Sequence, residues 1–392
     1  MNQSNLNSQI LNSISTVIQN GKRGLHEPEF NGNELKYLSD CIETSMVSSI
    51  GSYVTKFENE ISKFTKSKFA VATSNGTSAL HLALLCVGIQ PNDEVLISPL
   101  TFIATANAIA YCGGTPHFVD CESETLGIDP GKLRKYLLEN AKVESGRIVN
   151  KKTGNPIKAI IPMHCYGIPS RMEELIDVAN EFSLIIIEDA AESLGSLYRG
   201  KNTGTIGLVG IYSFNGNKIV TTGGGGILVT NDETIARKAK HLSTTARLSH
   251  LWNFQHDEIG FNYRMPNLNA ALGVAQLERI NEKIELKRNL HDKYANSLAG
   301  IRGVSLLKEP PGCRSNYWLN TIILDKAVSG AREEILRMAL ELNVAMRPPW
   351  ELLNSSIPYR DCPTMKTDCA EDLSKRIINI PSSESLGVLE NV

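Results

Sequence analysis

Between residues 68 and 232, short apolar runs alternate with longer segments in which apolar side chains recur every three or four positions. The short runs are rich in Ile and Val and predict buried strands, whereas the longer segments predict amphipathic helices. The predicted strands are 69–74, 94–98, 115–120, 157–164, 184–190 and 210–215. The predicted helices are 77–88, 101–113, 130–141 and 170–182. Such alternation predicts a parallel sheet with helices on both faces.

Four further stretches have patterns of their own. Residues 227–232, after four consecutive glycines, predict an additional antiparallel strand. The polar, turn-forming stretch 143–156 predicts a surface hairpin or loop insertion. Residues 267–298 have a continuous helical pattern and predict one long helix leading from a large domain into a smaller one. Apolar positions 10, 11, 14, 17 and 18 form one helical stripe, which predicts a docked amphipathic helix at the N-terminus.

Chain length and element order predict the domain organisation. A chain of 392 residues is too long for one ordinary core, so we expect two unequal domains. A predicted strand at 316–325 and a predicted helix at 332–343 fit a compact α+β unit. We therefore expect an N-terminal helix and arm at 1–30, a large α/β domain at 31–285 and a small C-terminal α+β domain at 286–392. The large domain should contain a mostly parallel, mixed sheet between layers of helices.

Composition narrows the class of protein. Forty basic and forty-two acidic residues give a net charge of −2 without runs of like charge, so no surface for nucleic acid or anionic lipid is indicated. The eight cysteines are scattered without a CxxC pair, which favours reduced thiols over disulfides or a metal site. Neither a signal peptide nor an apolar run of membrane-spanning length is evident. These features are typical of a soluble cytoplasmic protein.

Two polar residues lie at the ends of predicted strands, where α/β sheets bind their ligands. Asp189 ends the strand at 184–190, and Lys218 follows the strand at 210–215 by a short loop, so both should approach one crevice. Pyridoxal 5'-phosphate (PLP) requires such a pair. A lysine amine holds its aldehyde as a Schiff base, and a carboxylate keeps its pyridine nitrogen protonated. Taken singly, each residue is more simply explained as a surface lysine or a turn.

A turn between the first predicted strand and helix could hold the phosphate of such a cofactor. Backbone amides of Gly76, Thr77 and Ser78 lie at the helix start, where the helix dipole favours an anion. The hydroxyl of Ser213 could join them, and the ring of Phe102 could stack on the pyridine. A capped helix start and a core aromatic explain each feature alone equally simply. Their combination and order favour the cofactor site.

These residues lie in motifs that resemble the sugar aminotransferases of the DegT/DnrJ/EryC1/StrS family, a branch of the fold-type I PLP-dependent enzymes. The similarity extends from residue 51 to residue 350. Its motifs are SNGTSAL, PLTFIATANAI, MHCYG, IIEDAAESLG, YSFNGNK, GGGG and GFNYRMPNLNAALG. The resemblance implies the fold-type I architecture, PLP as cofactor, and a homodimer with shared active sites. Family dehydratases have histidine in place of the lysine, so Lys218 favours transamination.

The resemblance also implies a role for each candidate. Lys218 would form the Schiff base, and Asp189 would pair with the pyridine nitrogen. Phe102 and Ala191 would contact the two faces of the ring. Glu192 stands where many relatives have Gln or His, and a carboxylate beside the phenolic oxygen is unfavourable unless it is protonated or turned away. The phosphate would be held by Gly76, Thr77, Ser78 and Ser213, with Asn262 reaching the cofactor of the neighbouring subunit.

The N-terminal part of the chain, residues 25–58, resembles the LegC-type subgroup, which makes 4-amino sugars on routes to legionaminic acid and related bacterial glycans. The implied reaction moves an amino group from glutamate to carbon 4 of a UDP-linked 2-acetamido-2,6-dideoxy-4-keto-hexose. A perosamine synthase-like reaction on GDP-4-keto-6-deoxymannose is the alternative. Cationic partners for the diphosphate could be His164, Arg264 and Arg347, although a solvated arginine or a structural histidine explains each equally well.

Other classes of function fit less well. A desulfurase or amino-acid decarboxylase of the same fold is disfavoured because no catalytic cysteine loop is evident. A non-catalytic PLP-fold sensor is disfavoured because both Lys218 and Asp189 are present and no basic segment accompanies them. A nicotinamide-dependent oxidoreductase is disfavoured because the glycines at 223–226 lack G-x-G-x-x-G spacing and precede a strand rather than a helix.

Overall fold

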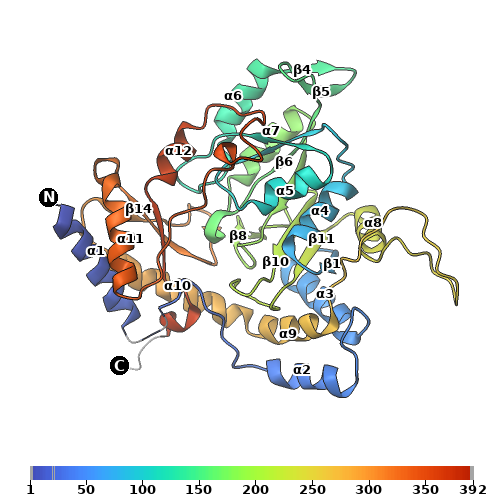
Figure 1. Cartoon of the computed structure of the whole chain (residues 1–392), viewed down its shortest axis with the longest axis horizontal. Coiled ribbons are helices and arrows are strands. Elements are labelled where there is room, and N and C mark those ends of the chain that lie inside the picture. Colours follow the sequence, from blue (N-terminus) through green and yellow to red (C-terminus); the bar gives the residue numbers. More distant parts are fainter. Residues whose placement is uncertain (1–2, 20, 22, 389–392) are drawn as a thin grey trace.

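The computed structural model describes residues 3–19, 21 and 23–388, and its centre is a seven-stranded sheet (Figure 1). β11 is antiparallel to both of its neighbours, and the remaining strands run parallel to one another. The predictions of a mostly parallel sheet and of an antiparallel strand after the glycines are therefore confirmed. In spatial order the strands are β1 (Phe69–Thr73), β11 (Gly226–Thr230), β10 (Val209–Ser213), β7 (Ile185–Asp189), β6 (Ile157–Ile161), β2 (Glu94–Ile97) and β3 (Thr115–Phe118).

Side chains that alternate along these strands supply two hydrophobic cores. Val71 and Leu228 face one core, which contains the inner side of α4, whereas Ala72 and Ile227 face another, which contains α3 and α9. A third core, under α6 and α7, covers β2, β3, β6 and β7. The sheet thus lies between layers of helices, as its alternation of strands and helices predicts. The helices are α2 (Glu34–Glu43), α3 (Ser52–Thr65), α4 (Gly76–Cys86), α5 (Ala104–Tyr111), α6 (Pro130–Asn140), α7 (Met172–Glu181), α8 (Glu233–Ser243) and α9 (Asn267–Glu278).

The polar insertion is a two-stranded hairpin at the periphery, at the top of Figure 1. β4 (Ala141–Glu144) pairs with β5 (Arg147–Asn150), and the two-residue turn between them has positive φ at both Ser145 and Gly146. Such turns match the twist of a hairpin, and glycine adopts this backbone conformation without strain. The prediction of a surface hairpin is confirmed.

The prediction of one long helix over 267–298 is wrong. The backbone leaves the helical region at Arg279, with φ −109° and ψ 9°, so α9 ends at Glu278 and α10 (Ile280–Ser297) begins after it. The Arg279 guanidinium is hydrogen-bonded to Glu282 of α10 and to Asn31. Both helices keep apolar positions at helical spacing, and a one-residue break between them leaves no mark in that pattern.

A further core lies around a small antiparallel sheet of β12 (Val304–Leu306), β14 (Asn320–Leu324) and β15 (Ile377–Ile380). α1 (Gln3–Ile18) packs here against α10 and α11 (Arg332–Glu341), with Ile10 and Ile14 fully buried. The predicted N-terminal amphipathic helix is thus confirmed. The remaining elements are β8 (Leu197–Tyr198), β9 (Lys201–Asn202), β13 (Cys313–Arg314), α12 (Asp368–Ser374) and short 3-10 turns at Cys165–Gly167, Lys326–Ala331, Leu353–Ser355 and Glu384–Gly387.

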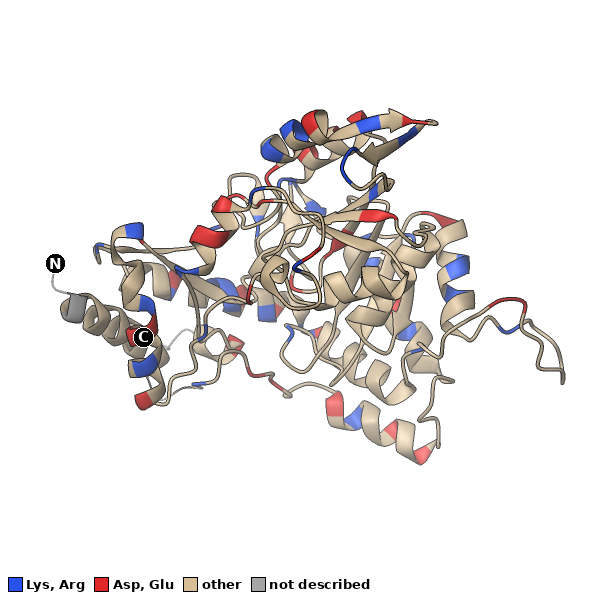
Figure 2. Ribbon diagram, turned by 45° about the horizontal axis from the view of Figure 1, so that its top comes forward, with Lys and Arg blue, Asp and Glu red and all other residues tan. Residues whose placement is uncertain are grey.

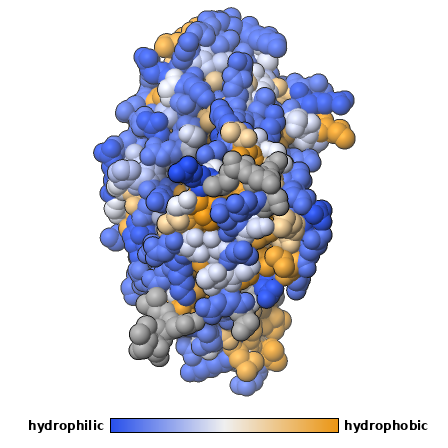
Figure 3. All heavy atoms as spheres, turned by 90° about the vertical axis from the view of Figure 1, so that its left-hand side faces the viewer, coloured by the Kyte–Doolittle hydropathy of each residue, from blue (hydrophilic) through white to orange (hydrophobic). Residues whose placement is uncertain are grey.

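The surface carries mixed charge. Basic and acidic residues are interspersed over the molecule (Figure 2), and the face that carries α1 and α11 is mostly hydrophilic with scattered apolar patches (Figure 3). All eight cysteines are free. Of the helices within residues 3–388, none combines the length and the apolar character needed to cross a membrane.

Candidate active site

A cavity of about 300 Å³ lies beyond the carboxyl ends of the parallel strands. Its wall is made by the segments that follow β1, β2, β6, β7 and β10, together with two segments from the C-terminal third of the chain. This is the edge where an open α/β sheet binds its ligands. Its lining residues are Asn75, Gly76, Thr77, Leu80, Phe102, Ala104, Thr105, Met163, Asp189, Ala191, Glu192, Ile211, Ser213, Asn215, Asn217, Lys218, Gly225, Trp318, Arg347 and Trp350.

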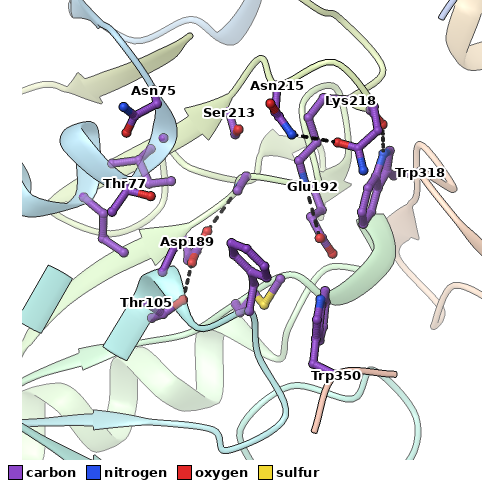
Figure 4. A pocket seen from close by; sticks show the side chains of 18 of the residues that line it. Asn75, Thr77, Thr105, Asp189, Glu192, Ser213, Asn215, Lys218, Trp318 and Trp350 are labelled. Carbon is purple, nitrogen blue, oxygen red and sulfur yellow. Dashed lines mark hydrogen bonds and ion pairs between the residues drawn. The ribbon is translucent and has the colours of Figure 1, made fainter. Parts of the chain in front are cut away.

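Asp189, the last residue of β7, lies in the middle of this cavity (Figure 4). Its carboxylate accepts a hydrogen bond from Thr105 Oγ1 at 2.8 Å and another from the Ala191 amide at 3.2 Å. Thr105 is itself within 3.1 Å of the Thr101 hydroxyl, which donates to the sulfur of Met163. These buried contacts fix the orientation of the carboxylate and leave part of it directed into the cavity.

The turn between β1 and α4 forms one end of the cavity. Asn75 caps α4, and Gly76 and Thr77 are its first residues, whose amides have no acceptor within the helix. A Cβ atom on Gly76 would lie 2.9 Å from the Cβ atom of Ser213, so only glycine allows this close approach of the turn to β10. Backbone amides, a helix N-terminus and the Ser213 hydroxyl together form a binding site for an anion.

Ser78 does not belong to that group. Its amide donates to Asn75 Oδ1 at 2.8 Å and its hydroxyl donates to the same oxygen at 3.1 Å, so both donors serve the helix cap. Its side chain is buried and lies outside the lining of the cavity. The structure therefore corrects the expectation for Ser78, and Asn75, an exposed residue of the same turn, lines the cavity instead.

Lys218 lies on the opposite side of the cavity from Thr77, and Ser213 lies between the two in this view (Figure 4). Its Nζ atom is 3.8 Å from the centre of the Trp318 ring and 3.2 Å from Glu192 Oε1. The indole of Trp318 is held in turn by a hydrogen bond to the backbone carbonyl of Asn217. The ammonium is thus directed across the cavity by an aromatic face and a carboxylate.

Glu192 is almost completely buried beside Lys218. Burial raises the pKa of its carboxyl group, while the charge of Lys218 and the Tyr166 amide act in the opposite direction. The Tyr166 amide donates to Glu192 Oε2 at 2.9 Å, from a residue with positive φ in the turn after β6. Glu192 therefore faces the cavity, and it is not turned away from it.

Aromatic side chains complete the wall. Phe102 lines the cavity with its ring half-exposed, and Ala191 lies in the same lining. Trp350 stacks on the Tyr166 ring at a centroid distance of 5.2 Å. The sequence did not predict Trp318 and Trp350 in the site, because they lie 100 and 132 residues after Lys218. Their only signal was the presence of large aromatics in NYWLN and RPPW.

Of the predicted cationic partners, Arg347 lines the cavity, and within the described part of the chain its guanidinium has no carboxylate partner. The structure does not bring His164 there. Its ring is fully buried, Nδ1 accepts a hydrogen bond from the Ser170 amide, and Nε2 donates to Glu188, so this histidine is structural. Arg264 is likewise engaged elsewhere, 2.7 Å from a Glu58 oxygen, outside the cavity.

Asn262 lies at the base of the loop that follows α8, and its side chain is exposed outside the cavity. This loop extends away from the body of the molecule (yellow in Figure 1). It carries exposed apolar side chains, among them Leu251, Trp252, Phe254 and Ile259, each more than 70% exposed. A contribution of Asn262 to the cavity of its own chain is therefore excluded by its position.

Known proteins resemble this chain over most of its length. The model of the DegT/DnrJ/EryC1/StrS aminotransferase family matches residues 28–390. EpsN of Bacillus subtilis (strain 168), named as a pyridoxal phosphate-dependent aminotransferase, is 37% identical over 92% of this chain and 91% of EpsN. The GDP-perosamine synthase of Escherichia coli O157:H7 is 37% identical over 92% of this chain and 93% of its own. That of Vibrio cholerae is 38% identical, with coverages of 91% and 93%.

Solved structures resemble the fold. PseC of Helicobacter pylori, an aminotransferase involved in pseudoaminic acid biosynthesis, superposes with a TM-score of 0.83 at 22% identity, covering 92% of this chain and 93% of PseC. DesI, crystallised with its TDP-sugar product, superposes with a TM-score of 0.80 at 26% identity, covering 92% of this chain and 87% of DesI.

Proposed function

Because this chain belongs to the DegT/DnrJ/EryC1/StrS aminotransferase family and is a PLP-dependent sugar aminotransferase, we propose that it transfers the amino group of glutamate to carbon 4 of a nucleotide-linked 4-keto-6-deoxy sugar. The observation that carries the choice of sugar is the set of relatives named GDP-perosamine synthase, at 35–38% identity. They favour GDP-4-keto-6-deoxymannose as acceptor over the UDP-linked 2-acetamido sugar that the LegC-type resemblance implies.

The residues that line the cavity match the functional groups of PLP. Gly76, Thr77 and Ser213 suit its phosphate, Lys218 suits its aldehyde, and Asp189, on another side of the cavity, suits its ring nitrogen. The close approach of Gly76 to Ser213 supports this assignment, because a methyl group there would lie 3.2 Å from Ser213 Oγ, the hydroxyl that we assign to the phosphate. We propose that Phe102 and Ala191 contact the two faces of the pyridine ring.

PLP, when bound, supplies a ring that accepts electrons from the carbon whose proton is removed. In our proposal Asp189 keeps the ring nitrogen protonated, with Thr105 holding the carboxylate in place. Lys218 would hold the aldehyde, and its free amine would act as general base and acid toward the substrate carbon. Trp318 and Glu192 direct its amine across the cavity during both steps.

Substrate recognition is proposed for Arg347, at the wall of the cavity. A guanidinium binds phosphate through two parallel hydrogen bonds, and Arg347 has no carboxylate partner within residues 23–388 to neutralise it. We assign it to the diphosphate of the nucleotide sugar or to the carboxylate of glutamate, which would occupy the same side in alternate half-reactions.

We further propose a homodimer in which Asn262 of each chain reaches the phosphate end of its partner's cavity. The apolar side chains on the loop after α8 and on α2, where Leu35 and Ile42 are exposed, would be covered by such an association. Analytical ultracentrifugation should show a dimer. A monomer that retains full activity would contradict the shared site.

The substrate is tested with glutamate and a panel of 4-keto-6-deoxy sugars on GDP, UDP and dTDP, with the product identified by mass. We expect the amino sugar to form fastest with GDP. Faster turnover of the UDP-linked 2-acetamido sugar would restore the LegC-type alternative, and no amination of any acceptor would contradict the proposed reaction.

A further inference from the structure

Glu192 and Lys218 form an ion pair that water barely reaches. The Glu192 side chain is 2% exposed and that of Lys218 13%, and their charged atoms are 3.2 Å apart. Besides Lys218, the carboxylate has one hydrogen-bond donor among residues 3–19, 21 and 23–388, the Tyr166 amide on Oε2. Oε1 is therefore left with the lysine as its partner. The amine also lies 3.8 Å from the centre of the Trp318 ring, which can attract an ammonium but cannot accept its proton.

Such a pair has two arrangements of its shared proton. As ammonium and carboxylate it carries two charges in surroundings that solvate them poorly, and as amine and carboxylic acid it carries none. Burial raises the pKa of Glu192 and so favours the uncharged arrangement. The nearby carboxylate of Asp189 acts in the same direction, because a second negative charge in one cavity is unfavourable.

The uncharged arrangement is the reactive one. Lysine bonds an aldehyde through the lone pair of its neutral amine, yet an ordinary lysine, with a pKa of about 10.4, is almost entirely ammonium at neutral pH. We infer that Glu192 takes the proton of the Lys218 ammonium and thereby prepares the amine for covalent attachment of the cofactor. This inference rests on the proposal that Lys218 is the attachment site.

Transfer of the proton and attachment of the cofactor need no oxidant, reductant or other reagent. One proton passes from Nζ of Lys218 to Oε1 of Glu192, giving a carboxylic acid and a neutral amine. The Nζ lone pair then forms a bond to the aldehyde carbon, and the aldehyde oxygen leaves as water with the two hydrogens that remained on the amine. A carbon–nitrogen double bond replaces a carbon–oxygen double bond, and no electrons are exchanged with another group.

Few other titratable groups of the described residues lie near Glu192. Asp189 lies at the same strand end, Cys165 and Tyr166 lie in the turn after β6, and Arg347 lines the same cavity. Burial raises the pKa of the Cys165 thiol and of the Tyr166 hydroxyl, so both stay neutral around pH 7. Neither can accept the lysine proton in place of Glu192.

The test is the rate at which cofactor-free protein attaches PLP, followed by borohydride trapping and peptide mass, with the variant Glu192→Gln. Glutamine keeps the size of the side chain and an oxygen for the Tyr166 amide, but it cannot take a proton. We expect attachment at pH 7 to slow by about 10- to 100-fold and to approach the wild-type rate near pH 10, where solvent deprotonates lysine directly.

An unchanged or faster attachment rate in Glu192→Gln would contradict the inference. If Glu192 only stabilised the ammonium, its neutral replacement would free the amine and attachment at pH 7 would be unchanged or faster, which would overturn the inference. Affinity for pyridoxamine 5'-phosphate, which needs no attack by lysine, should be the same in both proteins and controls for damage to the cavity.

The wild-type protein provides an independent check should the variant fold poorly. Its attachment rate should already be near a plateau at pH 7, and a tenfold rise per pH unit up to pH 10 would contradict the role of Glu192. Peptide mass separates this outcome from failure of the proposed function. A label on a residue other than Lys218 refutes the attachment site itself, whereas a label on Lys218 with the wrong pH profile refutes only the part played by Glu192.

Discussion

Replacement of Thr105 by valine tests how the protein controls Asp189. Valine has nearly the shape of threonine, so the change removes the donor 2.8 Å from Asp189 Oδ2 and leaves the Ala191 amide as the other hydrogen bond to this carboxylate. A hydrogen bond to a charged group contributes about 1.5–3 kcal/mol. If that energy acts on the transition state, where the ring nitrogen must stay protonated, kcat should fall by roughly 10- to 150-fold at 1.4 kcal/mol per factor of ten.

The chain offers a matched control, Thr101→Val. Thr101 is buried in the same network, 3.1 Å from Thr105 Oγ1, but does not touch Asp189. In an assay of glutamate-dependent amination over pH 6–9, Thr105→Val should lower kcat and change its pH profile while KM for glutamate stays the same. Equal losses in the two variants, or full activity of Thr105→Val, would refute the idea that this hydroxyl positions the carboxylate.

Three further predictions follow from individual contacts. Lys218→Ala should bind PLP without covalent attachment, so borohydride should leave no label on the chain; a label at another lysine would contradict the assignment. Gly76→Ala should weaken PLP binding by about 10-fold or more, since its methyl group would lie 2.9 Å from Ser213 Cβ and overpacking costs about 1–3 kcal/mol; equilibrium dialysis measures the affinity. Burial lowers the pKa of His81 below 6.5, so the unfolded chain binds the proton more readily and stability should fall as the pH drops below about 6.5. His81→Phe, in a cluster of aromatic rings, should lose less Tm between pH 7.5 and pH 5.5 than the wild type, and an equal loss would argue against this histidine as the cause.

Local pattern was sufficient to predict the central sheet and the crevice at its edge that Asp189 and Lys218 share. Short apolar runs rich in Ile and Val identified the strands, and because parallel strands end at one edge, the sequence alone predicted that Asp189 and Lys218 approach one crevice. The family resemblance and the choice of PLP are confirmed by the match over residues 28–390. Ser78 was expected in the site because its amide lies at a helix start, and His164 because it follows the end of a strand. Sequence does not reveal that their donors and acceptors are already used by a helix cap and a buried carboxylate.

The features of the site and fold that the sequence did not predict depend on contacts between distant segments. Trp318 and Trp350 reach the cavity only because the C-terminal third of the chain packs over the edge of the large sheet. The break at Arg279 is set by two backbone angles and by contacts with Asn31, and the periodicity of the flanking helices hides it. The significance of Glu192 likewise needed the 3.2 Å distance to Lys218, because from sequence alone this carboxylate could equally have been turned away.

The most direct test of the proposed reaction is transfer of nitrogen-15 from labelled glutamate to GDP-4-keto-6-deoxymannose by the purified protein. We predict a GDP-linked 4-amino sugar that contains the label, formed by the wild type and not by Lys218→Ala. An amino sugar without the label, or a Lys218→Ala variant that turns over like the wild type, would contradict the account.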